Sequence, residues 1–232
     1  MSDPDPSKAR TIQDIFTRIA SRYDLMNRLM SLGQDRGWRR AAIRQAALPP
    51  GGYLLDLGSG TGDMSIETLR QYPQGRVLAL DFTPAMMQAG RQRPHAPRDW
   101  TAGDAMHLPL PDAAFDVVVS AFLLRNVADL QQALKEQYRV LKPGGRWVAL
   151  DATRPAKGGF FSPWVKIYLH QFIPLLGRII TGEVRAYTYL PESMDLFVRA
   201  EELAARAAAA GFREVMFRRM NFGTMATHWG IK

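Results

Sequence analysis

Residues 54–63 read Leu54-Leu55-Asp56-Leu57-Gly58-Ser59-Gly60-Thr61-Gly62-Asp63, and this stretch decides the fold of the chain. An apolar run of strand length ends in three glycines that alternate with small polar residues. Because glycine tolerates positive φ and lets a ligand approach bare backbone, the run predicts a strand, a binding loop and a helix that begins near Asp63. The unpaired N–H groups and the positive dipole end of that helix would point at the bound group.

The spacing of the glycines distinguishes between cofactors. Dinucleotide sites use G-x-G-x-x-G, whereas this chain has G-x-G-x-G with Asp63 directly behind it. A carboxylate at that place would repel a pyrophosphate and attract an ammonium or a sulfonium. S-adenosylmethionine carries both cations in its methionine half, so the loop favours this cofactor over a nicotinamide.

Two further acids follow at expected strand ends. The apolar run 76–80 ends in Asp81, which lies 25 positions after Asp56 and so near the spacing at which a carboxylate binds ribose hydroxyls in βαβ nucleotide sites. Asp104 follows the next expected strand, where it would lie at the adenine edge. A lone glycine-rich turn is usually only a tight turn, but acids at three successive strand ends favour a binding site.

Composition limits the remaining possibilities. With 232 residues, of which 47% are hydrophobic, the chain can bury one full core with an appended cap. The absence of cysteine excludes disulfides, thiolate nucleophiles and cysteine-ligated metals, and no metal site is expected. The polar N-terminus lacks a secretory signal, and no apolar run is long enough to span a bilayer. These features predict a cytoplasmic protein.

The net charge of +8 is unevenly distributed. Residues 46–153 hold 10 Lys and Arg against 11 Asp and Glu, whereas the flanks hold 20 against 11. Basic flanks can favour nucleic acid, anionic lipid or an acidic substrate, although a solvated arginine-rich surface is the commoner explanation. Charge therefore does not choose between these partners.

Alternating elements predict an α/β fold. Apolar residues recur at helical spacing in residues 8–48, and these helices should cover the site. Strands are predicted near 53–57, 76–80, 115–122 and 146–151, with helices near 63–71, 84–92 and 129–141. This alternation is typical of a doubly wound, mainly parallel sheet, which binds ligands at the carboxyl ends of its strands. A turn is predicted at 141–145, a helix at 200–210, and closing strands at 214–218 and 225–228.

The predicted organisation has four parts. An N-terminal helical segment (1–48) covers a Rossmann-like binding core (49–153), and residues 198–232 return to that core. Between them, residues 154–197 form an aromatic cap insertion with Phe160, Phe161, Trp164, Tyr168, Phe172, Tyr187 and Tyr189. This insertion could close over the site and exclude water from it.

With these residues identified, the chain resembles the class I S-adenosylmethionine-dependent methyltransferases, and within them the ubiquinone/menaquinone biosynthesis C-methyltransferase family. Three motifs carry the resemblance: Phe16-x-x-Ile19-Ala20-x-x-Tyr23-Asp24-x-Met26-Asn27-x-x-Met30-Ser31-x-Gly33 with Trp38, then Leu124-Arg125-Asn126-Val127-x-Asp129, and Tyr187-x-Tyr189-Leu190-x-Glu192-Ser193. The resemblance implies a seven-stranded sheet with N-terminal helices and a helical cap insertion.

The resemblance also implies the site residues. The expected cofactor-binding set is Asp56, Gly58, Ser59, Gly60, Thr61, Gly62, Asp63, Asp81, Phe82, Met86, Gly103, Asp104, Ala105 and Ser120. The expected catalytic set is Arg125, His228, Tyr23 and Asn126. The chain departs from the family at residues 150–155, which lack the usual glutamate and phenylalanine, at Phe197-Val198, which lacks a proline, and at a paired glycine near the C-terminus.

The implied reaction is ring-carbon methylation of a prenylated hydroquinone, either demethylmenaquinol or its benzoquinol counterpart. A neutral quinol carbon is a poor nucleophile, and a neighbouring cation could lower the hydroxyl pKa from about 10 by roughly 1 to 3 units. Arg125 is the expected cation. Because arginine is a poor base, the proton should leave through water or through one of four candidates, His228, His170, Tyr23 and Asp24.

Several alternatives remain open at this point. The acceptor could be another small aromatic or lipid-like molecule, and a non-catalytic scaffold that binds the cofactor is a further option. A nucleic-acid methyltransferase is disfavoured because residues 120–125 lack the Asn/Asp-Pro-Pro-aromatic turn of base methylation. A membrane-resident acceptor would favour peripheral contact with the inner face of the membrane, and a homodimer is possible.

Overall fold

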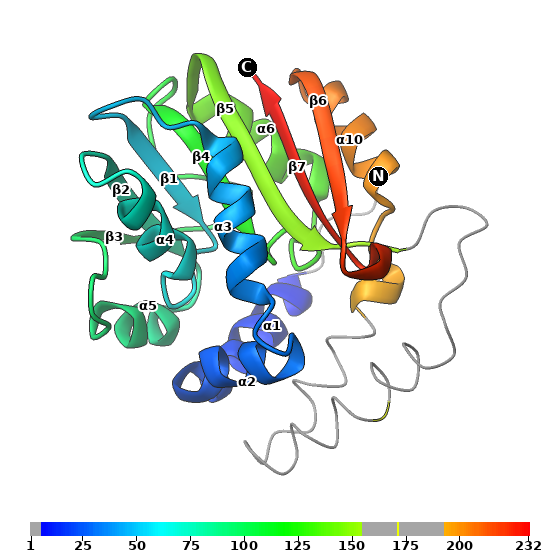
Figure 1. The fold of residues 1–232 in the computed structure, drawn as a ribbon. Helices are drawn as coiled ribbons and strands as arrows, with labels where there is room; N and C mark the ends of the chain where they lie inside the picture. The colour runs from blue at the N-terminus through cyan, green and yellow to red at the C-terminus, as the bar shows by residue number, and fades with distance from the viewer. Residues whose placement is uncertain (1–5, 155–170, 172–192) are drawn as a thin grey trace.

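The computed structural model describes residues 6–154, 171 and 193–232, and it shows one twisted sheet with helices on both faces (Figure 1). The sheet has seven strands in the order β3-β2-β1-β4-β5-β7-β6. In chain order they are β1 (Tyr53–Leu57), β2 (Arg76–Asp81), β3 (Asp99–Ala102), β4 (Phe115–Ala121), β5 (Leu141–Ala152), β6 (Arg213–Met220) and β7 (Met225–Ile231). The first five strands are parallel, and β7 is antiparallel to both β5 and β6. This topology confirms the predicted seven-stranded, doubly wound fold.

Helices connect the strands and precede them. Before β1 come α1 (Pro6–Ile19), the short 3₁₀ helix η1 (Ala20–Arg22), α2 (Tyr23–Met30) and α3 (Asp35–Ala46). The crossovers are α4 (Asp63–Gln71), α5 (Pro84–Arg91) and α6 (Leu130–Val140), and the C-terminal part adds α10 (Ala200–Ala209) and η3 (Asn221–Gly223). The predicted helix at 63–71 therefore has the observed bounds, because Gly62 ends the loop and Asp63 opens the helix.

The sheet separates two apolar cores because successive strand residues point to opposite faces. Leu55, Leu57 and Trp147 pack with α6 and α10, whereas Leu54 and Val148 pack with α3 and α4. All five side chains are fully buried. These cores hold the strands rigidly, so that their carboxyl ends form a fixed platform.

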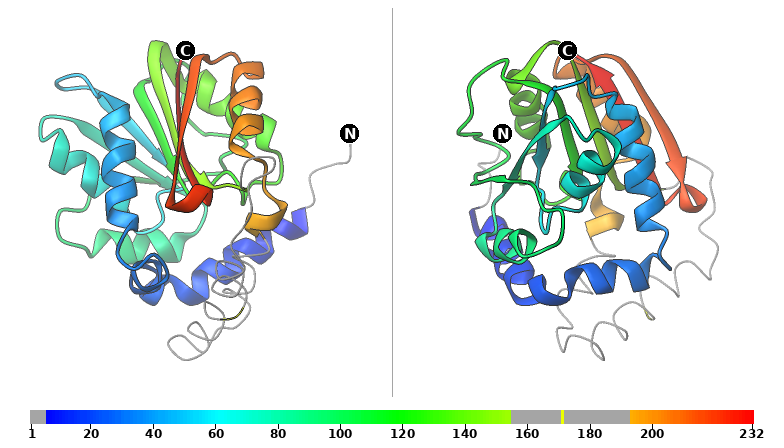
Figure 2. Two further views of the ribbon diagram at one scale, coloured as in Figure 1. Left: turned by 45° about the vertical axis from the view of Figure 1, so that its right-hand side comes forward. Right: turned by 60° about the vertical axis from the view of Figure 1, so that its left-hand side comes forward.

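The two further views in Figure 2 show α1 and α2 lying across the side of the sheet where the parallel strands end. This is the side on which open α/β sheets bind their ligands. The N-terminal helices therefore lie over the glycine loop that follows β1.

The start of the fifth strand differs from the prediction. The turn predicted at 141–145 belongs to β5, which begins five residues before the predicted start at 146. Leu141 pairs with Phe115 ahead of a register shift in β4, and the bend is taken up at Gly144, whose φ is +75°. Most of the predicted cap insertion, with its seven aromatic residues and His170, lies outside the described residues.

Candidate active site

The glycine loop takes backbone conformations that require glycine. Gly58 has φ +67° and Gly60 has φ +56°. A Cβ atom on Gly58 would lie 2.8 Å from Cδ1 of Leu123, and one on Gly60 would lie 3.2 Å from Cε of Met86. Side chains at these positions would therefore be both strained and crowded, and the loop presents bare backbone instead.

The loop is tied to the next strand. The N–H groups of Gly58 and Ser59 both donate to the Leu80 carbonyl, at 2.8 and 3.0 Å. The N–H of Gly60 donates to Oδ2 of Asp81 at 2.7 Å, and the N–H of Thr83 donates to Oδ1 of the same carboxylate at 2.7 Å. Burial raises the pKa of Asp81, whereas the two N–H groups favour its charged form. Asp81 therefore holds the loop and the start of α5 together.

A cavity of about 90 Å³ lies between this loop and the N-terminal helices. Nine of the predicted site residues line it: Gly58, Gly60, Asp81, Phe82, Met86, Gly103, Ala105, Tyr23 and Asn126. The other walls come from Ile12 and Phe16 of α1, and from Leu57, Leu80, Thr83, Ala121, Phe122 and Leu123. The sequence did not single out Ile12 and Phe16 as site residues, although their helical spacing placed them on a helix above the loop.

Asp56 lies beneath the loop and not in the cavity wall. Its side chain is fully buried, and Oδ2 accepts hydrogen bonds from the backbone N–H and the hydroxyl of Ser65, at 2.9 and 2.6 Å. Burial raises the pKa of Asp56 to about 7, with the nearby charges of Asp81 and Asp63 adding to the effect. The structure therefore gives Asp56 a part in fixing the first turn of α4.

The raised pKa of Asp56 predicts a stability change with pH. The folded protein holds the proton up to about pH 7, whereas the unfolded chain releases it near 3.8, so the free energy of unfolding falls as pH rises between these values. Asp56→Asn removes this component. Urea denaturation should show the variant gaining up to ~4 kcal/mol relative to the parent protein across this range. A constant difference between the two proteins from about pH 4 to about pH 8 would contradict the assignment.

Asp63 is already engaged by two arginines. Its Oδ1 accepts from Nη2 of Arg93 at 2.7 Å, and its Oδ2 lies 3.3 Å from Nη2 of Arg39. Although burial opposes ionisation, the two guanidinium groups hold the pKa of Asp63 below its usual range. Asp63 was expected to attract the cationic end of the cofactor, but Arg93 and Arg39 already compensate its negative charge. Asp63 also does not line the cavity.

Arg93 links three elements around the loop. Its Nη1 donates to the Thr61 carbonyl at 2.9 Å and lies 3.2 Å from Oδ2 of Asp24 on α2, while Nη2 binds Asp63 on α4. The hydroxyl of Thr61 in turn donates to Oδ1 of Asp24 at 2.6 Å. Arg93 therefore fastens α2 to the glycine loop, with its side chain only 22% exposed.

Arg93→Met should loosen this fastening while keeping the length of the side chain. We expect the KM for the methyl donor to rise about tenfold with kcat changed by less than about threefold, because the loop is misplaced without loss of a reacting group. Steady-state kinetics at varied donor concentration measures both constants. The matched control is Arg70→Gln, since Arg70 pairs with Glu67 on α4, the helix that Asp63 begins, and is exposed. Equal donor KM values for the Arg93 variant and this control would count against the role of Arg93.

Arg125 forms a buried ion pair that the sequence did not predict. Its Nη1 donates to Oδ1 of Asp151 at 2.7 Å, and its backbone N–H lies 3.3 Å from Oδ2 of the same residue. The two side chains are 6% and 2% exposed. Nε of Arg125 has no hydrogen-bond partner among the described residues, so this guanidinium retains a donor for another group.

Tyr23 lines the cavity together with Asn126. Its ring packs edge-on against Phe16, with the ring centroids 5.8 Å apart. Burial raises the pKa of the Tyr23 phenol, although Asn27 and the charges of Arg125 and Arg39 act in the opposite direction. The phenol is therefore neutral near pH 7. It can donate or accept a hydrogen bond, but it is a weak base.

The structure contradicts the expectation that His228 accepts a proton from the substrate. His228 is 1% exposed on β7, its ring stacks on Phe217, and its Nε2–H donates to the Ala200 carbonyl at 2.9 Å. Burial lowers the pKa of His228 to about 4. The ring packs in the core against α10 and not at the cavity, so the family resemblance misplaced its role.

The remaining predicted residues surround the cavity without lining it. Asp104 accepts from the N–H of Met106 at 2.9 Å and lies between the lining residues Gly103 and Ala105. Ser59 and Ser120 are buried, and neither hydroxyl oxygen has a hydrogen-bond partner within the described ranges. Thr61 binds Arg93 and Asp24, and Gly62 directly precedes α4. These positions stay predictions as cofactor contacts.

The residues fit a nucleoside-type methyl donor, but the cavity as it stands is too small for one. Bare backbone at Gly58 and Gly60, the carboxylate of Asp81 and the unpartnered hydroxyls of Ser59 and Ser120 form a suitable set of polar groups. Sites for ligands of that size usually enclose about 300 Å³ or more. A bound donor therefore requires some of the side chains around this cavity to move apart.

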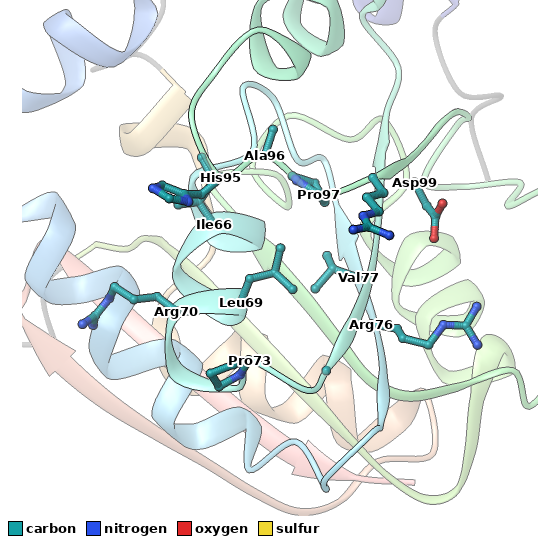
Figure 3. Close-up of a pocket in the computed structure, with 12 residues that line it drawn as sticks. Ile66, Leu69, Arg70, Pro73, Arg76, Val77, His95, Ala96, Pro97 and Asp99 are labelled. Atoms are coloured by element: carbon teal, nitrogen blue, oxygen red, sulfur yellow. The ribbon is translucent and has the colours of Figure 1, made fainter.

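A larger cleft of about 860 Å³ lies elsewhere, between α4 and the segment that leads into β3 (Figure 3). It is lined by Ile66, Leu69, Arg70, Pro73, Gly75, Arg76, Val77, His95, Ala96, Pro97, Arg98 and Asp99. None of the predicted site residues lies there, because this cleft opens at the amino ends of β2 and β3. The smaller cavity at the glycine loop is therefore the candidate active site.

Two features of the described residues bear on metal binding and on membrane insertion. No group of three or more His, Cys, Asp and Glu side chains there could hold a metal ion. Within the same ranges no helix is both long and apolar enough to cross a bilayer.

Comparisons with known proteins agree on one family. Residues 5–232 match the model of the ubiE/COQ5 methyltransferase family. The chain is 44% identical over 227 residues to the ubiquinone/menaquinone biosynthesis C-methyltransferase UbiE of Desulfotalea psychrophila, covering 97% of this chain and 92% of the relative. It is also 44% identical over 228 residues to the demethylmenaquinone methyltransferase of Deinococcus radiodurans, covering 97% and 94%.

A solved structure supports the fold. The S-adenosylmethionine-dependent methyltransferase of Thermotoga maritima described as a possible histamine N-methyltransferase matches with a TM-score of 0.67. The match covers 94% of this chain and 98% of the other, at 21% identity. At that identity the likeness shows the shared architecture alone.

Proposed function

The chain belongs to the ubiE/COQ5 methyltransferase family and is an S-adenosylmethionine-dependent methyltransferase, and on this premise we propose that its acceptor is a prenylated quinol methylated at a ring carbon. One observation supports this most strongly. The glycine loop and Asp81 meet Tyr23 and Asn126 in a single cavity, and Cζ of Arg125 lies 5.4 Å from the ring centroid of Phe122, which also lines it. The residues proposed to bind the donor and those proposed to hold the acceptor therefore share one cavity.

The acceptor is demethylmenaquinol or the related benzoquinol. The names of the relatives cover both possibilities, since one is a demethylmenaquinone methyltransferase and another serves ubiquinone as well as menaquinone biosynthesis. Both acceptors carry a ring hydroxyl next to the carbon that receives the methyl group. The same arrangement of residues would therefore serve either ring.

The bound donor supplies an electrophilic methyl group on a sulfonium. The chain must make the ring carbon nucleophilic, and this requires the adjacent hydroxyl to lose its proton. The Arg125 guanidinium lies over the ring of Phe122 in the cavity wall, its Nε has no partner among the described residues, and its charge would favour the quinolate. After the new carbon–carbon bond forms, the same ring carbon releases its proton and aromaticity returns.

Tyr23 and Asn126 hold the acceptor in this scheme. Both line the cavity, and the neutral phenol of Tyr23 can donate a hydrogen bond to the quinolate oxygen. Because His228 lies in the core, the hydroxyl proton leaves through water or through Asp24, whose carboxylate lies beside the loop. Phe16, Phe122 and Leu123 exclude water from the space in which the methyl group moves.

The acceptor chemistry also bears on where the enzyme works. A prenylated quinol resides in the bilayer, so the enzyme meets it at the membrane surface as a peripheral protein of the cytoplasm. The basic flanks of the chain support this arrangement.

A second candidate is methylation of another small aromatic or lipid-like acceptor. It is favoured by residues 150–155, which lack the glutamate and phenylalanine usual in the family and which include Asp151, the partner of Arg125. An assay panel separates the two possibilities. We expect purified protein and labelled methyl donor to methylate demethylmenaquinol or demethylated benzoquinol at least about 100-fold faster than unrelated phenols of similar size. Preference for an unrelated phenol would overturn the proposal.

A further inference from the structure

Three leucines form an exposed apolar face on α2 and the turn after it. Leu25, Leu29 and Leu32 are 52%, 38% and 77% exposed, and their spacing places Leu25 and Leu29 on one side of the helix. Seven large apolar side chains are exposed among the described residues, and three of them lie within residues 25–32. We call these three residues the leucine face.

The rest of α2 is already used by the fold. Met26 is 1% exposed, and Tyr23 lines the active-site cavity. Asp24 is fastened to Thr61 and Arg93. The helix therefore has an inner side that forms the wall of the site, while its leucines point away from that wall.

The charge around the leucine face is positive. Residues 18–36 contain four arginines and two aspartates. Both aspartates are engaged, Asp24 with Arg93 and the buried Asp35 with Arg39. Arg18, Arg22 and Arg36 are exposed, so the outward charge of this segment is basic.

We propose that the leucine face docks the enzyme on an anionic lipid bilayer, with Leu25, Leu29 and Leu32 in the interface and Arg18, Arg22 and Arg36 at the lipid headgroups. Exposed apolar side chains in a segment that also carries exposed cations are what such a surface binds. The inference rests on the proposed function, because contact with a bilayer would serve an enzyme whose acceptor, a prenylated quinol, resides there. It places the membrane one helix diameter, about 10 Å, from the cavity that Tyr23 lines.

A second copy of this chain fits the face less well. A symmetric contact through α2 would bring the exposed arginines of both copies together, and like charges across an interface disfavour association. An anionic bilayer has no such penalty, since every arginine gains from it.

Sedimentation with lipid vesicles tests the proposal on the full chain. Vesicles of phosphatidylcholine with phosphatidylglycerol should bind the parent protein, and salt should weaken the binding. Leu25→Gln/Leu29→Gln/Leu32→Gln should lower the partition coefficient at least about tenfold, because glutamine preserves the helix but removes the apolar contact. Arg22→Gln/Arg36→Gln should weaken binding to the anionic vesicles but not to phosphatidylcholine alone.

Matched variants on other surfaces provide the controls. Met216→Gln removes another exposed apolar side chain, and Arg44→Gln/Arg98→Gln removes two exposed charges at the opposite end of the sheet. Both should bind vesicles like the parent protein. Unchanged thermal melting and donor affinity in the leucine variant show that its fold and active site are intact.

Three outcomes would overturn the proposal: no vesicle binding by the parent protein, equal binding by the leucine variant, or a lipid-free dimer that becomes monomeric in that variant. The last would assign the face to a second copy. Turnover of a short-chain, water-soluble quinol separates this inference from the proposed function. Turnover without vesicle binding removes the docking surface alone, whereas vesicle binding without turnover of any quinol removes the acceptor assignment.

Discussion

Replacement of Arg125 by alanine should lower kcat for quinol methylation about a hundredfold, while the Kd of the methyl donor stays within about twofold. The expected loss follows from the acid–base chemistry, because a neighbouring cation lowers a phenolic pKa by roughly 1 to 3 units and each unit changes the quinolate fraction tenfold. The pH at which the rate reaches its plateau should rise correspondingly in the variant. Rapid-quench kinetics over a pH series and donor calorimetry measure the two effects separately.

The ion pair with Asp151 demands a second variant. Removing Arg125 alone leaves the Asp151 carboxylate buried at 2% exposure without its partner, which should cost about 3 to 5 kcal/mol of stability. Arg125→Ala/Asp151→Asn should recover much of that stability but none of the activity. If the double variant regains both, or if Arg125→Ala methylates at the parental rate, Arg125 has no electrostatic role in the reaction.

The second large effect concerns Asp81. Asp81→Asn should weaken donor binding at least about a hundredfold, since an amide can accept from only one of the two N–H groups that the carboxylate now holds. Hydrogen bonds to a charged group contribute about 1.5 to 3 kcal/mol each, so the loss of one, together with an opposed NH₂ group, accounts for this magnitude. Calorimetric titration with S-adenosylmethionine and with S-adenosylhomocysteine measures it.

Asp99→Asn is the matched control for Asp81. Asp99 begins the neighbouring strand β3 at the opposite end of the sheet, where it is exposed. Its variant should bind the donor like the parent protein. Parental donor affinity in the Asp81 variant, with the same melting temperature as the control, would contradict the role of Asp81 in the site.

Local sequence patterns predicted the first strands and helices of the sheet well. The strands near 53–57 and 76–80 and the helix at 63–71 were visible because apolar periodicity and the glycine loop are both short-range signals. The acid at the end of β2 followed from the same logic. Neighbouring parallel strands end at the same edge of the sheet, so residues that directly follow these strands lie close together.

Pairings between distant segments could not be predicted in the same way. Arg93 joins Asp24 and Asp63 across 69 and 30 positions, and Arg125 joins Asp151 across 26. Nothing in the sequence near an arginine indicates which distant carboxylate it will contact. The only local signal was the departure of residues 150–155 from the usual family sequence.

His228 shows how a resemblance can mislead. Its position near the C-terminus matched the family, but β7 alternates its side chains and directs His228 to the face that carries Trp147 and Ala149. The four residues from Met225 to His228 are all buried, which is the pattern of a strand inside the sheet. The strand predicted at 225–228 already implied that this histidine could point into the core.

The position of the transferred methyl group tests the central claim most directly. Incubation of the purified protein with methyl-deuterated S-adenosylmethionine and demethylmenaquinol, followed by mass spectrometry and NMR of the product, should show the label on a ring carbon. The Asp81→Asn and Arg125→Ala variants should form little of this product. Label on an oxygen, or no labelled quinol from protein that binds the donor, would contradict the account.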